Sequence, residues 1–103
     1  MNNAGIIDDV TFVVNDTHKP HRLITVNSYV LSVHCPIFKR VLFDVAGNKR
    51  RRRTKFMLDG LNSDGLLELI RRMYSGKPEI TNTDSDNLNN TARRLGYQFI
   101  VKR

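Results

Sequence analysis

Hydrophobic and polar residues alternate along three short stretches, and this pattern predicts three strands. Residues 10–14 (VTFVV) are a run of β-branched and aromatic residues that follows two aspartates. Residues 18–26 form a second stretch, and the turn-forming residues 15–17 lie between the two. We therefore expect a hairpin near the N-terminus. Residues 54–58 (TKFML) repeat the pattern and predict a short third strand.

The spacing of apolar residues changes after the second strand and predicts two short helices in immediate succession. Asn27 and Ser28 can cap the free amides of a first helical turn. Pro36 suits the first position of the second helix because it has no N–H to leave unpaired, and Cys35 stands in the capping position before it. The apolar face expected for this second helix consists of Ile37, Phe38, Val41, Leu42 and Val45. This unit of one strand and two helices is the centre of the predicted fold.

Two more helices are predicted in the second half of the chain. Residues 62–64 cap the first of them, and Glu68 can reach Arg72 four residues later on its exposed side. Its buried stripe is predicted to be Leu66, Leu67, Leu69, Ile70, Met73 and Tyr74. Residues 84–86 cap a further helix with a narrow apolar line, and residues 97–101 are expected to pack over the core as a short terminal element.

The length and composition of the chain indicate a single domain. A chain of 103 residues with 40% hydrophobic and 26% charged residues is typical of a soluble protein folded around a single core. No apolar run approaches the length of a membrane span, and the polar N-terminus is not a secretory signal. A single cysteine cannot form an internal disulfide, which fits a nuclear or cytoplasmic protein.

The formal charge of +7 is concentrated in one basic run, Lys49, Arg50, Arg51, Arg52 and Arg53. Like charges in sequence repel and resist burial, so we expect an exposed loop. Three interpretations are open: a solvated loop, a nuclear import signal, or an electrostatic contact with nucleic acid or an acidic protein surface. The run lacks aromatic or amide side chains to read bases, so any contact with nucleic acid should be weak and non-specific.

Candidate catalytic and metal-binding residues are few. His18 and His21 are close in sequence, and His34 adjoins Cys35, but a structural zinc site normally shows paired ligands on both sides. Cys35 has a histidine neighbour but no third group to complete a nucleophilic site. There is no phosphate-binding glycine loop and no nucleophile elbow in the sequence. We therefore predict a non-enzyme without a metal or cofactor.

The order of these elements from Asp9 to Val101 resembles the BTB/POZ domain family. In that fold a strand feeds a helical hairpin with a Ser-Pro-x-Phe-type turn, to which residues 35–38 (CPIF) are similar, and residues 73–76 (MYSG) look like its Tyr-Thr-Gly-type helix ending. The resemblance implies an α+β fold, with a small three-stranded sheet flanked by about five helices. Residues 1–8 would be an N-terminal tail and residues 9–103 the domain.

The resemblance also implies a role in holding other proteins, because BTB domains are interaction modules that commonly form homodimers through the first short helix. Residues carried onto that interface are Ser28, Tyr29, Ser32 and Val33. Val30 and Leu31 suffice for the core side of this helix, which leaves Tyr29 and Val33 in need of cover. The other reading is that they pack under the N-terminal segment or the terminal helix. The expected partner is a second copy or another BTB domain, in a nuclear or chromatin and transcription setting.

Two further features of the family are incomplete in this sequence. Asp9 matches the acidic pocket position of many BTB domains, but Asn27 and Ser28 stand where transcriptional members have a histidine and its basic neighbour. Members that recruit a cullin ubiquitin ligase carry an apolar-x-Glu pattern after the second helix, whereas residues 45–48 (VAGN) contain no glutamate. A substrate adaptor for a cullin is therefore the disfavoured alternative function, and non-specific nucleic-acid binding is a second one.

Overall fold

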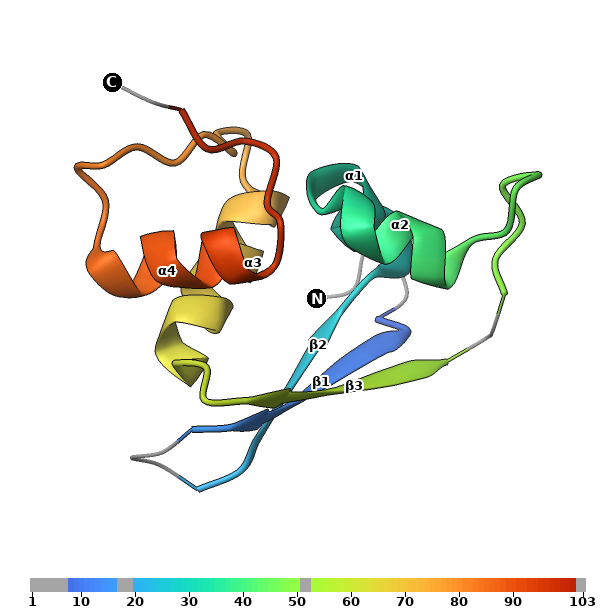
Figure 1. The fold of residues 1–103 in the computed structure, drawn as a ribbon, viewed down its shortest axis with the longest axis horizontal. Helices are drawn as coiled ribbons and strands as arrows, with labels where there is room; N and C mark the ends of the chain where they lie inside the picture. The colour runs from blue at the N-terminus through green and yellow to red at the C-terminus, as the bar shows by residue number, and fades with distance from the viewer. Residues whose placement is uncertain (1–7, 17–19, 51–52, 102–103) are drawn as a thin grey trace.

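The computed structural model of the protein describes residues 8–16, 20–50 and 53–101 (Figure 1). Within these residues, one three-stranded sheet carries its helices on one face, so that the domain has two layers. The elements in chain order are β1 (Val10–Asn15), β2 (Arg22–Val26), α1 (Ser28–His34), α2 (Pro36–Leu42), β3 (Thr54–Asp59), α3 (Ser63–Tyr74) and α4 (Asp86–Arg94). The α+β class and the three strands confirm the prediction. The described residues form four helices rather than about five.

β1 lies at the centre of the sheet, in the order β2-β1-β3. It pairs with β2 as the predicted antiparallel hairpin, with Val10 opposite Val26, and it pairs with β3 in parallel, with Val10 opposite Thr54. Because side chains alternate between the two faces of a strand, Val10, Phe12 and Val14 all point to the helical side, where they are fully buried. The other face of the sheet has no helix among the described residues, and Leu23 and Met57 are exposed on it.

The helical hairpin forms where the sequence predicts it. The Asn27 carboxamide oxygen accepts hydrogen bonds from the backbone amides of Tyr29 and Val30, which confirms Asn27 as the cap of α1. Pro36 opens α2 as expected. Cys35 occupies the expected capping position before it, but its side chain makes no capping hydrogen bond. The buried thiol packs into the core instead.

The apolar face predicted for α2 is divided between core and solvent. Phe38 and Leu42 are buried and contribute to the core, and the Phe38 ring meets Phe12 edge-on. Ile37 and Val41 are 59% and 52% exposed, so the prediction that they lie on the same buried face is wrong. Neighbouring residues of a helix project about 100° apart, so Ile37 and Val41 lie on a different side of α2 from Phe38 and Leu42, and only the latter side faces the core.

In the C-terminal half, both helices are capped at their N-termini, and α3 and α4 pack closely where they cross. Asn62 caps α3 and Ser85 caps α4 through side-chain oxygens that accept from Gly65 N and Leu88 N. Gly65 lies where α3 and α4 meet, and a Cβ there would come within 2.7 Å of the Asn87 carbonyl oxygen. Only glycine allows this approach, which seats α4 against the core.

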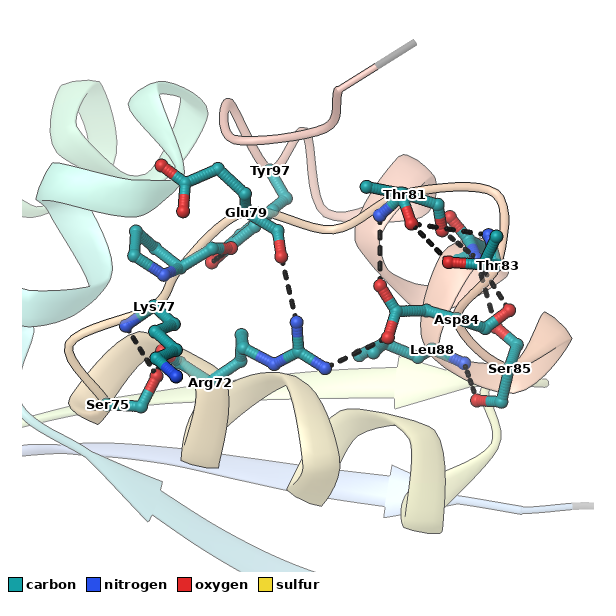
Figure 2. Close-up of polar contacts among 12 residues, drawn as sticks. Arg72, Ser75, Lys77, Glu79, Thr81, Thr83, Asp84, Ser85, Leu88 and Tyr97 are labelled. Atoms are coloured by element: carbon teal, nitrogen blue, oxygen red, sulfur yellow. Dashed lines mark hydrogen bonds and ion pairs between the residues drawn. The ribbon is translucent and has the colours of Figure 1, made fainter. Parts of the chain in front are cut away.

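Arg72 does not form the predicted pair with Glu68 along α3. Its guanidinium donates to the Glu79 carbonyl oxygen at 2.8 Å and to Asp84 Oδ1 at 3.0 Å, as Figure 2 shows. Arg72 thereby fastens the segment between α3 and α4 to the helix. The reason is geometric, because a carbonyl and a carboxylate held on one loop accept from two sides of the planar guanidinium.

The terminal segment is extended rather than helical. Ile100 forms a parallel bridge with Ile80, and the amide of Gln98 donates to the carbonyl oxygen of His34 at the end of α1. The buried Tyr97 ring stacks on His34 at 5.8 Å between ring centroids. The segment therefore covers the core as predicted, through backbone bonds and ring contacts.

Candidate protein-interaction surface

The four residues predicted for an interface on α1 divide into two pairs. Tyr29 and Val33 are 60% and 57% exposed, whereas Ser28 and Ser32 are buried. Ser28 donates through both its backbone amide and its hydroxyl to Asp9, and the Ser32 hydroxyl donates to the Tyr29 carbonyl oxygen. Of the four residues, Tyr29 and Val33 are therefore the ones exposed for contact, and the interface itself stays a prediction.

Three large apolar side chains are exposed on the helical hairpin, Val33 on α1 and Ile37 and Val41 on α2. We call them the apolar ridge, and each is more than half exposed. Ile37 and Val41 lie one helical turn apart on the same side of α2, and residues at this spacing are surface neighbours. Several large apolar side chains exposed together on a small domain indicate a contact surface for another protein.

A groove lies on a different side of α2, beside the loop that leads to β3. It has a volume of about 700 Å³. Its lining residues are Tyr29, Ser32, Pro36, Lys39, Arg40, Phe43, Asp44, Val45, Ala46, Gly47 and Arg50. We call it the α2 groove. The rings of Tyr29 and Phe43 are in contact, with centroids 5.0 Å apart, and Val45 is fully exposed.

Asp9 stands at a buried junction of three elements. Its carboxylate accepts from Ser28 N at 2.7 Å and from Ser28 Oγ at 2.8 Å, and it also pairs with the ammonium group of Lys49. Burial alone raises the pKa of Asp9, but the hydrogen bonds from Lys49 and Ser28 outweigh it and hold the pKa below its ordinary value. The carboxylate thus stays charged and joins β1, α1 and the loop before β3.

This geometry corrects two sequence predictions. The charged pair of Asp9 is complete, because Lys49 supplies the cation that is missing at Asn27 and Ser28. Lys49 is accordingly half-buried and does not belong to an exposed run. It also forms an antiparallel bridge with Phe43, and Arg50 Nε donates to the Phe43 carbonyl oxygen at 3.1 Å. Arg50 and Arg53 are exposed as predicted. The predictions for Arg51 and Arg52 lie outside the described residues.

Lys49 and the two exposed α2 residues, Ile37 and Val41, are the side chains that sequence reasoning misplaced. The pairing of Lys49 with Asp9 spans 40 positions and leaves no local signal. For Arg50, the only sequence cue is its position next to a glycine-containing turn, where Gly47 has a positive φ of 85° that folds the loop back on Phe43.

The residues considered for chemistry do not come together. Among residues 8–16, 20–50 and 53–101, no three His, Cys, Asp or Glu side chains are placed to hold a metal ion; the prediction for His18 lies outside these ranges. Burial raises the pKa of Cys35 to about 12, so its thiol stays protonated and is a poor nucleophile at neutral pH. His34 Nδ1 is 2.8 Å from the Val30 carbonyl oxygen, which ties the ring to its own helix.

Comparison with known proteins gives one family. The family model described as BTB/POZ domain matches residues 1–103, the whole chain. No curated protein matches the chain. In the part of the chain that the structure describes, no helix is long and apolar enough to span a membrane.

Proposed function

The chain belongs to the BTB/POZ domain family, a family of protein-interaction domains rather than of enzymes, and we propose that this member self-associates through its helical hairpin. The observation that carries the proposal is the apolar ridge. Val33, Ile37 and Val41 remain uncovered although the domain buries a complete core elsewhere. A second copy of the ridge would remove these side chains from water at about 25 cal/mol for each Å² buried.

The three ridge side chains are uncharged, which suits contact between identical copies, and Arg50 borders them only beside Val41 at one end. In a two-fold dimer the same patch meets itself, so like charges in the patch would repel, while apolar side chains do not. The sheet face opposite the helices offers Leu23 and Met57, but Lys55 is exposed beside them on β3, which disfavours the same arrangement there.

The test is light scattering across a dilution series, with urea unfolding as a check of stability. We expect a dimer that dissociates on dilution, and a Val33→Glu/Ile37→Glu variant that associates about a hundredfold more weakly, since facing carboxylates must desolvate and repel. Leu23→Glu/Met57→Glu is the matched control, because it adds the same charge to two exposed apolar positions on the sheet. A protein that is monomeric at every concentration, or a control that dissociates as easily as the ridge variant, would refute the proposal.

A further inference from the structure

We propose that the α2 groove binds an acidic peptide segment that carries a large apolar side chain. This proposal rests on the role of the chain as a protein-interaction domain, but it concerns a surface other than the apolar ridge. Pro36, Lys39 and Arg40 line the groove from α2, while Ile37 and Val41 point to a different side of the same helix. Val41 and Arg50 line one small hollow together, so the two surfaces adjoin there, but Val33 and Ile37 do not line the groove and test the ridge separately.

The floor of the groove suits an apolar anchor. The Phe43 ring is buried beneath it and contacts Tyr29, while Pro36, Val45 and Ala46 add aliphatic surface around the ring. Phe43 is also fixed at its backbone, because its carbonyl oxygen accepts from Arg50 and its amide donates to Lys39. The groove is open and has a volume of about 700 Å³, within the size range of ligand-binding clefts.

The margin of the groove selects the charge of the partner. Three cationic side chains, Lys39, Arg40 and Arg50, line it against a single carboxylate, Asp44. Asp44 already accepts from the backbone amide of Asn48 at 2.8 Å, which commits one of its oxygens within the loop. The bond from Arg50 Nε to Phe43 holds that guanidinium at the groove, so it is pre-organised to meet a carboxylate.

The same charges disfavour two other occupants. A second copy would bring its own Lys39, Arg40 and Arg50 against these three across a two-fold axis, and like charges facing each other oppose association. Nucleic acid would satisfy the cations. It would gain little from Pro36, Val45 and Ala46, which offer no aromatic face for base stacking. Of the two aromatic residues that line the groove, Tyr29 is exposed but the Phe43 ring is buried.

The experiment measures fluorescence anisotropy of a labelled synthetic peptide with a central Leu-Phe pair between aspartates. We expect saturable binding that weakens as salt rises, because the rim charges are exposed and screened. Arg40→Glu/Arg50→Glu should weaken binding about tenfold or more, whereas Arg93→Glu on α4 makes the same kind of change away from the groove and should have little effect. Val45→Ser should weaken binding several-fold with no loss of folding, since Val45 is fully exposed.

Three results would overturn the proposal. One is equal binding of a peptide in which the Leu-Phe pair is replaced by glycines, which would show attraction to charge alone. Another is a single-stranded oligonucleotide that binds as tightly and displaces the peptide. The third is absence of peptide binding, whether the protein is a dimer or a monomer by light scattering. Because ridge variants leave the groove intact, a failed self-association result with normal peptide binding would refute only the earlier proposal.

Discussion

Asp9 and Asp84 fasten two parts of this fold with the same chemistry in different surroundings. The Asp9 side chain is 7% exposed and accepts from Ser28 and Lys49, which lie 19 and 40 positions away in the chain. The Asp84 side chain is 24% exposed and accepts from Thr81 N at 2.9 Å and from Arg72 at 3.0 Å, both within twelve positions (Figure 2). One carboxylate joins distant segments in the interior, and the other stabilises a local loop at the surface.

The comparison teaches that the cost of losing a hydrogen-bond acceptor depends on what its donors meet afterwards. The two donors from Ser28 to Asp9 are fully buried, so water cannot replace the carboxylate without opening α1 from β1. The donors of Asp84 lie near the surface, where water can replace it. The loss of folding stability should therefore differ clearly between the two sites when each acid is removed.

The largest effect is expected from Asp9→Ala. Removing the carboxylate leaves the amide and hydroxyl of Ser28 buried without this acceptor, and we expect a loss of about 3 kcal/mol in the free energy of unfolding. Asp84→Ala, the surface counterpart, should lose about 1 kcal/mol. Urea unfolding followed by circular dichroism measures both. Equal losses would show that burial does not distinguish the two junctions.

A smaller effect is expected from Lys49→Ala, which keeps the bonds from Ser28 but removes the cation that faces Asp9. We expect a loss of about 1–2 kcal/mol, since a largely buried carboxylate then lacks its compensating charge. Lys55→Ala is the matched control, because Lys55 is a nearby lysine exposed on β3 and should change stability by less than about 0.5 kcal/mol. If both variants behave alike, the pairing of Lys49 with Asp9 contributes nothing in solution.

The smallest effect is expected from pH. Asp9 has a lowered pKa for the reasons given above, and the pKa of Asp84 is lowered by the bond from Thr81 and by Arg72, against the opposing effect of burial. A lowered pKa in the folded state means that the stabilisation is complete above the unfolded value and is lost as pH falls through the folded value. Stability should therefore decline below about pH 4. Asp9→Asn and Asp84→Asn should each reduce the slope of that decline in urea titrations; an unchanged slope in both would contradict the assignment.

Local chemistry made much of this fold predictable. Asn27 caps α1 because a carboxamide reaches the free amides of the next turn whatever lies elsewhere in the chain. Pro36 begins α2 for an equally local reason. The strands follow from alternation, and β1 to β2 follows from a short connection. These features depend on neighbours within a few residues, which the sequence displays directly.

The interaction surfaces were less predictable because they depend on packing. Periodicity places Ile37 and Phe38 on a helix, but which of them meets the core is set by where α2 rests against the sheet. Arg72 pairs with Asp84 and not with Glu68, because the loop after α3 brings the Asp84 carboxylate and the Glu79 carbonyl to its guanidinium together. Lys49 joined Asp9 only because the loop folds back on Phe43. Each outcome is decided by residues distant in sequence.

The parallel pairing of β1 with β3 has a consequence for synthesis on the ribosome. β1 and β2 can pair as soon as residue 26 has emerged, but the second edge of β1 waits for Thr54–Asp59 and for the helical hairpin that carries the chain back across the sheet. During that interval the nascent chain presents an unpaired edge of valines and phenylalanine. Chaperone binding would be concentrated in this window, and elongation speed between the two strands would influence the yield of native protein.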